Sequence, residues 1–418
     1  MAETSIEWTD RSVNPIRARN LETGSVGHYC EKPSTGCANC YAEEWNSRVR
    51  PVPNSDKLIG LGLAYAKKNR DKVEIFLDES KLQEVIKRRK PSKFFWCDMT
   101  DLFGEWVPDE MLDRCFAAMA MTPQHTHQVL TKRPERMAQY LVWKGHNIEA
   151  AERGDNCDCR QCAIVRPMAA SLMARGISEP DAYAGPAFYV WKNWPLPNVW
   201  LGTSVENQQT ADERIPHLLR VPAAVRFLSM EPLLGPIKLD PSWLPHRFNR
   251  EPSCDHCEVC VGRDGWQNVR PDTHGPFIDW VIVGGESGPG ARPCQVEWIR
   301  DIVRQCKAAG VKCFVKQLGA FVVDRNDAGF EAENETWAEG PDKGKPTNPK
   351  AWPTPVDVIH DLDGTRDGYQ GAPVRVALID RKGGDWSEWP DDLRVREFPE
   401  VARCASITTN AGSEPAEG

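Results

Sequence analysis

The sequence has no long run of hydrophobic residues and no excess of positive charge. Its 418 residues contain 52 lysines and arginines against 60 aspartates and glutamates, which gives a formal charge of −8. We therefore expect no membrane protein and no globally basic nucleic-acid coat, so that any contact with DNA or RNA requires a local basic patch. The first ten residues are polar and contain no apolar segment of signal-peptide length, which favours a cytoplasmic protein.

Cysteine, by contrast, is abundant, with 15 residues. Cytosolic thiols are kept reduced, which argues against a disulfide framework. Nine of the cysteines fall in three tight groups: Cys30, Cys37 and Cys40; Cys157, Cys159 and Cys162; and Cys254, Cys257 and Cys260. Thiolates at such short spacing are typical ligands of zinc and of iron–sulfur clusters.

Short apolar runs that end in polar residues recur along the chain, and most precede a segment with helical periodicity. This alternation predicts β/α units and a parallel sheet, as a partial or complete (β/α) barrel or a doubly wound open sheet. The expected helices are clearest at Pro108 to Met121 and Val296 to Ala309. The expected strands are Ser12 to Asn14, Phe94 to Cys97, Gln128 to Leu130, Val199 to Gly202, Val225 to Ser229, Trp280 to Gly284 and Val311 to Val315.

Composition divides the chain into a barrel core over about residues 1–322 and a C-terminal extension. Two cysteine-rich insertions, at about 145–197 and 240–275, interrupt the alternation. We expect an irregular extension over 323–405, rich in glycine, proline and acidic residues, with a compact piece from Val374 to Pro399. The last segment, 406–418, reads as a disordered tail.

Polar residues follow six of the expected strands. Barrels carry their chemistry at the carboxyl ends of the strands, and these residues favour the barrel over the open sheet. Helix capping is the alternative explanation for any single one of them. The polar residues that follow the six strands are Asp98, Thr100 and Asp101; Thr131, Lys132 and Arg133; Thr203, Ser204 and Glu206; Glu231; Glu286 and Ser287; and Lys316 and Gln317.

The first cysteine group lies on a loop before an expected helix that starts near Tyr41. Cys30, Cys37 and Cys40 suit an iron–sulfur cluster or zinc. Three ligands on a four-iron cluster would leave one iron open, whereas zinc would need a fourth ligand such as Glu31, Glu43 or His28.

Several motifs along the chain resemble one family. They are SIEWTD (5–10), STGCANCYAEEW (34–45), WCDMTDLFGEWVPDE (96–110), QVLTKRPER (128–136), VWLGTSVENQ (199–208), RFLSMEPLLGPI (226–237), DWVIVGGESGPGARP (279–293), VKQLGA (315–320) and KGGDWSEWPDDLRVREFP (382–399). The chain resembles the phage and bacterial three-cysteine-motif family of unassigned function, whose members look like divergent radical S-adenosylmethionine enzymes.

The resemblance implies a partial barrel whose 4Fe–4S cluster is held by Cys30, Cys37 and Cys40 and binds S-adenosylmethionine at its open iron. Reductive cleavage would then generate a 5′-deoxyadenosyl radical. The sequence departs from the commonest radical-enzyme pattern, because six residues separate Cys30 from Cys37, where three are usual.

Candidate cofactor residues lie at the strand ends. The backbone of Gly284 and Gly285 permits close approach of a ligand, and Glu286 would accept hydrogen bonds from an amino group or from ribose. The family's strand ends add Ser204 and Glu206, and Asp98 could serve similarly.

Lys132, Arg133 and Arg136 form a basic trio on the expected active face, which favours a phosphate-bearing substrate. Internal pairing with carboxylates is the alternative. The two inserted cysteine groups predict structural zinc, shared or separate, or an auxiliary iron–sulfur cluster.

Together these patterns predict a radical S-adenosylmethionine-like enzyme acting on a nucleotide or nucleic-acid base, in DNA modification or repair. It would need an electron donor, and a companion protein could complete the site. One alternative is a non-catalytic zinc protein that binds nucleic acid or a partner. Another is a hydrolase or nuclease that uses Asp98, Asp101 and Glu286 around a divalent ion.

Overall fold

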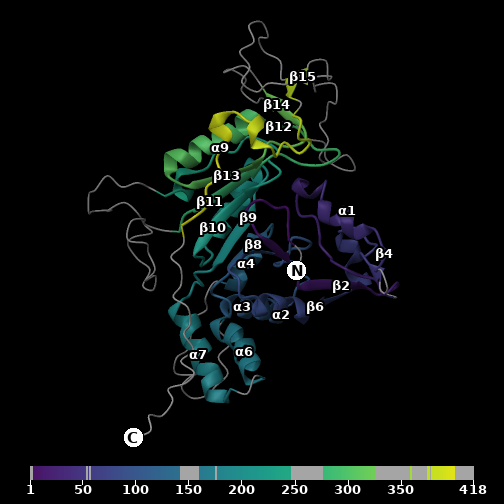
Figure 1. Cartoon of the computed structure of the whole chain (residues 1–418), viewed down its shortest axis with the longest axis vertical. Helices are drawn as coiled ribbons and strands as arrows, with labels where there is room; N and C mark the ends of the chain where they lie inside the picture. The colour runs from purple at the N-terminus through teal and green to yellow at the C-terminus, as the bar shows by residue number, and fades with distance from the viewer. Residues whose placement is uncertain are drawn as a thin grey trace, which may run out of the picture.

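The computed structural model is built around a curled seven-stranded sheet that forms a half-barrel (Figure 1). It describes residues 3–52, 55, 58–141, 160–174, 177–245, 276–324, 358–359, 374–376 and 378–400. All neighbouring strands of this sheet are parallel, so their carboxyl ends share one edge. In spatial order they are β1 (Arg11–Val13), β7 (Lys93–Trp96), β8 (Thr126–Thr131), β9 (Val199–Ser204), β10 (Val225–Met230), β11 (Trp280–Gly284) and β13 (Lys312–Gln317).

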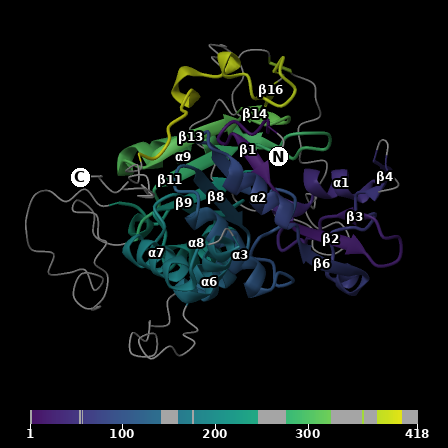
Figure 2. The same cartoon turned by 60° about the horizontal axis from the view of Figure 1, so that its bottom comes forward.

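Helices cover the convex face of the half-barrel, as the alternating pattern predicts (Figure 2). In α9 the buried residues recur at helical spacing, at Val296, Ile299, Ile302, Val303 and Cys306, and the helix ends where Gly310 adopts a left-handed conformation. The helices are α2 (Glu79–Lys87), α3 (Asp109–Ala120), α4 (Pro134–Leu141), α8 (Gln208–Leu219) and α9 (Val296–Ala309).

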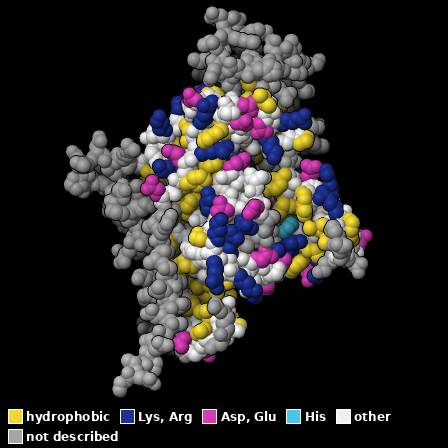
Figure 3. Space-filling view, in the orientation of Figure 1, with side chains coloured by type: hydrophobic (Ala, Val, Ile, Leu, Met, Phe, Trp, Pro, Cys, Tyr) yellow, Lys and Arg dark blue, Asp and Glu magenta, His cyan; other side chains and the backbone are white. Residues whose placement is uncertain are grey.

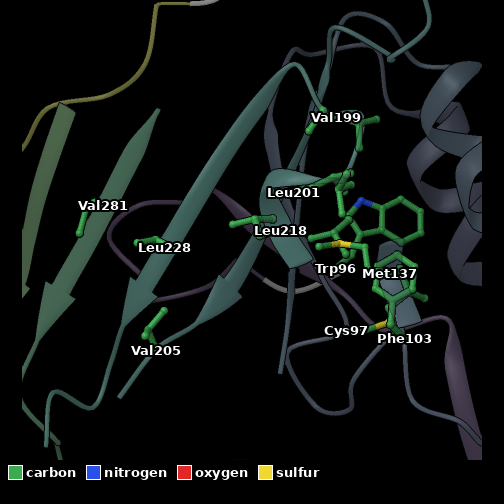
Figure 4. Packing of buried hydrophobic residues seen from close by; sticks show 14 of the residues in the cluster. Trp96, Cys97, Phe103, Met137, Val199, Leu201, Val205, Leu218, Leu228 and Val281 are labelled. Carbon is green, nitrogen blue, oxygen red and sulfur yellow. The ribbon is translucent and has the colours of Figure 1, made fainter. Parts of the chain in front are cut away.

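The two faces of the sheet have different cores. Every second strand residue points outward and packs under the helices, and Figure 4 shows Trp96, Met137 and Phe103 in this layer. On the other face, apolar strand residues and Trp8 form a separate cluster, to which none of the described helices contributes: Trp8, Phe95, Trp200, Val225, Phe227, Trp280, Ile282 and Phe314. Trp280 is its centre, with its ring centroid 5.6 Å from that of Trp200 and 5.7 Å from that of Phe227.

Two smaller sheets flank the half-barrel, and the alternation did not predict them. A five-stranded sheet contains β4 (Arg50–Pro51), β5 (Leu58–Ile59), β3 (Val26–Gly27), β2 (Ile16–Asn20) and β6 (Val73–Leu77), with α1 (Tyr41–Ser47) nearby. A four-stranded sheet contains β12 (Cys294–Gln295), β14 (Val322–Asp324), β16 (Val374–Val376) and β15 (Val358–Ile359).

The first insertion contributes a helical pair, α6 (Arg160–Met173) and α7 (Glu179–Lys192), and α6 also contacts α3. The compact C-terminal piece lies along the edge strand β13. Val315 N donates to Val395 O at 2.8 Å, and Glu397 N donates to Cys313 O at 2.8 Å. Most of the second insertion and the expected tail lie outside the described residues. Within the part of the chain that is described, no helix is long and apolar enough to cross a membrane.

Candidate functional site

The first cysteine loop lies over the carboxyl edge of the half-barrel, between β3 and α1. Cys37 ends a 3₁₀ turn (Thr35–Cys37), and Cys40 precedes the first turn of α1. The thiols of Cys30, Cys37 and Cys40 are all free and half-buried. The turn and the helix start therefore fix two of the three thiols by local backbone geometry.

Electrostatic interactions show that the three thiols are neighbours. Burial raises the pKa of Cys30, and the nearby Asp101, Cys37 and Cys40 raise it further, while Arg133 opposes them. Burial likewise raises the pKa of Cys40. Among the residues that the structure describes, no three His, Cys, Asp or Glu side chains are arranged to hold a single metal ion.

Glu206, just beyond β9, anchors the centre of this loop. Its side chain is fully buried, and it accepts hydrogen bonds from Ser34 Oγ at 3.1 Å and Arg214 Nη1 at 3.0 Å and pairs with Lys132 Nζ at 2.8 Å. Burial alone would raise its pKa, but Lys132 and Arg214 outweigh burial and lower it to about 2. A Cβ at Gly36 would overlap this carboxylate, so the loop fits here because residue 36 has no side chain.

Glu286, just beyond β11, anchors the same loop from the other side. Arg292 donates to both of its carboxylate oxygens, at 2.9 and 2.6 Å, and also donates to Thr35 O at 2.8 Å. Asn39 donates to Glu286 Oε2 at 3.0 Å. These hydrogen bonds oppose the effect of burial and lower the pKa of Glu286, so that this carboxylate stays ionised.

Asp101 and Arg133 form the third anchor, beyond β7 and β8. Arg133 pairs with Asp101 at 2.9 Å and donates to Glu31 O at 3.1 Å, next to Cys30. Thr131 Oγ1 donates to the other oxygen of Asp101 at 2.7 Å. The loop is thus held at residues 31, 34, 35 and 39 by groups that follow three strands, β8, β9 and β11, and Asp101, beyond β7, holds Arg133 in place.

Asp98 lies beside the helix that follows the loop. It accepts a hydrogen bond from Asn14 Nδ2 at 2.6 Å and one from the Tyr41 hydroxyl, and burial raises its pKa. The preceding residue, Cys97, has φ = 62°, an unusual conformation for a residue other than glycine. The sequence does not predict this turn at Cys97, after which Asp98 contacts Tyr41.

Most of the predicted site residues meet at this edge: Cys30, Cys37, Cys40, Asp98, Lys132, Arg133, Ser204, Glu206 and Glu286. Arg136 is placed elsewhere, because it pairs with Asp109 at 3.0 Å at the start of α3. All three members of the basic trio are paired with carboxylates, which is the alternative that the sequence left open. Their role in binding substrate phosphate remains a prediction.

Gly284 and Gly285 approach the chain's own backbone. A Cβ at Gly285 would overlap Leu318 O, and Gly285 N donates to Gln317 O at 3.1 Å. These glycines therefore allow the ends of β11 and β13 to lie close together. Their proposed contact with a cofactor remains a prediction.

Three residues that the sequence did not single out complete the anchors: Asn39, Arg214 and Arg292. Asn39 lies between two of the cysteines, and Arg292 closes the GGESGPGAR stretch, but neither position reveals its partner. Of the inserted cysteines, Cys162 lies half-buried on α6. Cys157, Cys159, Cys254, Cys257 and Cys260 lie outside the described residues, so zinc or a second cluster there remains a prediction.

These features define an α/β half-barrel protein with a cysteine loop fastened to its strand ends. The chain belongs to the family described as "Protein of unknown function (DUF5131)", whose model matches residues 3–346. No curated protein and no solved structure matches the chain.

Proposed function

We propose that this protein is a radical S-adenosylmethionine-like iron–sulfur enzyme that acts on a nucleotide or nucleic-acid base. The observation that carries the proposal is the position of the cysteine loop, which groups from three strand ends hold over the carboxyl edge of a parallel half-barrel. This edge is where barrel enzymes place their reactive groups.

The donor set fits a four-iron cluster with Cys30, Cys37 and Cys40 as its ligands. Soft thiolates are the ligands that iron–sulfur clusters prefer, and three of them leave one iron open. Burial raises the pKa of Cys30 and of Cys40, so cluster binding would displace the protons of these two thiols. When bound, the cluster supplies the electron for reductive cleavage of S-adenosylmethionine, which generates a 5′-deoxyadenosyl radical.

The chain's own residues position the loop. Glu206 and Glu286 stay ionised and accept hydrogen bonds from the side chains of Ser34 and Asn39, one on each side of Cys37. Arg292 and Arg133 donate to the backbone carbonyls of residues 35 and 31. Asp98 and Ser204 lie at the same edge, where they can orient the amino-acid or ribose end of a nucleoside cofactor. Lys132 is partly accessible beside Glu206, and it is our candidate for binding the phosphate of the substrate.

Aromatic side chains fill the amino end of the half-barrel, and this restricts chemistry to the opposite edge. Trp8, Trp200 and Trp280 are all buried there. Water that approached a radical intermediate from the amino end of the half-barrel would have to pass this aromatic layer.

The test is electron paramagnetic resonance on anaerobically reconstituted, dithionite-reduced protein, with and without S-adenosylmethionine. We expect a reduced four-iron signal that shifts when the cofactor is added and that is lost in Cys37→Ala. Cys306→Ala is the control, because Cys306 is a buried cysteine near the C-terminal end of α9, which leads into the start of β13, and its loss should leave the signal intact. A silent spectrum with zinc as the only bound metal would overturn the proposal in favour of a zinc protein.

A further inference from the structure

A basic groove lies at the opposite, amino-terminal end of the sheet from the cysteine loop. It is an open hollow of about 530 Å³ lined by Arg11, Glu84, Lys87, Arg88, Arg89 and Lys90. Arg11 begins β1, and the other five residues come from the last turns of α2 and the segment that leads into β7. The groove is therefore separate from the strand-end site.

Three cations of this groove are exposed, at Lys87, Arg89 and Lys90. In the part of the chain that the structure describes, no carboxylate pairs with any of them, whereas the one acid in the lining, Glu84, pairs with Lys81 at 2.6 Å. On a chain with a net charge of −8, such a concentration of positive charge is a local exception. Figure 3 shows basic side chains over much of this face of the molecule.

The backbone beneath these cations is fixed. Arg88 O accepts hydrogen bonds from Gln124 Nε2 at 3.2 Å and from His125 Nε2 at 3.0 Å, and Arg88 Nε donates to Ser92 Oγ at 2.9 Å. Holding the segment in place lowers the entropy lost when a ligand binds.

We propose that this groove, defined by Arg11 and residues 87–90, binds the phosphate backbone of a nucleic acid. Every lining residue is charged, whereas the centre of a protein–protein interface is apolar and depleted of charge. Nucleic-acid interfaces are polar and strongly positive, and lysine and arginine side chains are among the groups that contact their phosphates.

The test compares two triple variants of the full chain with the same change in charge. One removes the groove cations (Lys87→Gln, Arg89→Gln, Lys90→Gln). The control removes three exposed lysines outside the groove (Lys67→Gln, Lys68→Gln, Lys72→Gln). Fluorescence anisotropy with a labelled 20-nucleotide DNA strand, between 50 and 200 mM KCl, gives the Kd and its salt dependence.

We expect the groove variant to bind at least about 10-fold more weakly at 100 mM KCl. The slope of log K against log salt should become shallower by about 2, since each lost phosphate contact removes about 0.7. The control variant should bind like the wild type. Equal weakening in both variants, unchanged binding in the groove variant, or no binding by the wild type would each overturn the proposal. Equally good competition by polyglutamate would also overturn it, because the groove would then accept acidic proteins.

Binding is measured in both the reconstituted protein and Cys37→Ala. The groove does not involve the cysteine loop, so failure of cluster assembly should leave DNA binding unchanged. The two proposals can thus fail separately.

Discussion

The cysteine loop can pack against Glu206 because Gly36 has no side chain. Glu206 is buried at zero side-chain exposure between two cations and a serine hydroxyl, and Gly36 packs against its carboxylate. A charged group this deeply buried is stabilised only while its partners stay in place. Substitution at Gly36 should therefore disturb the loop and the carboxylate together.

We predict that Gly36→Ala will displace the loop and reduce iron binding after reconstitution several-fold. The new methyl group would also destabilise the fold by about 1–3 kcal/mol, as overpacking typically does. Iron content per chain and urea denaturation measure the two effects. Gly235→Ala is the control, since its Cβ would have no neighbour nearer than 3.8 Å. Full iron content in Gly36→Ala would show that the contact with Glu206 does not position the loop.

Among the elements, the C-terminal piece has the clearest structural role. Residues 395–397 add main-chain hydrogen bonds to β13, the edge strand of the half-barrel, and Phe314 forms an antiparallel bridge with Arg396. Trp389 and Leu393 are buried beside it. An uncovered edge strand is a template for aggregation, and this piece covers one.

Truncation after residue 373 should therefore expose β13 and destabilise the protein. We expect a loss of at least about 3 kcal/mol in the free energy of unfolding, since a buried tryptophan is lost, and concentration-dependent light scattering. Truncation after residue 400 keeps the whole piece and serves as the control. If both truncations are equally stable and monomeric, the piece does not protect the edge.

For the whole molecule, burial of ionisable groups makes stability depend on pH. Burial lowers the pKa of both His28 and His127 to about 3, and ion pairs lower that of Glu206 to about 2. His127 accepts a hydrogen bond from Trp96 Nε1 at 3.0 Å and lies 2.9 Å from Thr122 Oγ1, so a second ring proton would face another donor. Each of these groups binds protons more readily in the unfolded chain.

Stability should therefore be full above about pH 6.5 and fall as the pH drops toward 3, with Glu206 adding to the loss below about 4.5. At pH 5 each buried histidine should lower the free energy of unfolding by about 2 kcal/mol relative to pH 7.5. Urea denaturation at both values measures the change, and His127→Gln should remove about half of it. Phe94→Leu, beside His127, should destabilise the protein equally at both pH values. An unchanged pH dependence in His127→Gln would contradict this assignment.

The seven strands of the half-barrel and the helices α3 and α9 could be predicted from the sequence, because they depend on local patterns. Trp280 to Gly284 forms a continuous apolar run, and α9 repeats its buried residues at helical spacing. Parallel strands then bring their polar ends to one edge, which is why Asp98, Glu206 and Glu286 could be named as site residues. The three cysteines were evident from their spacing alone.

Tertiary structure alone decided what these residues contact. Arg292 meets Thr35 across 257 positions of sequence, and Lys132 pairs with Glu206 and not with another of the 60 acidic residues. The small sheets also escaped prediction, because strands of two to five residues carry too little periodicity to stand out. Composition and period determined the half-barrel and the edge where its polar strand ends meet, whereas long-range pairing of charges decided how the cysteine loop is held there.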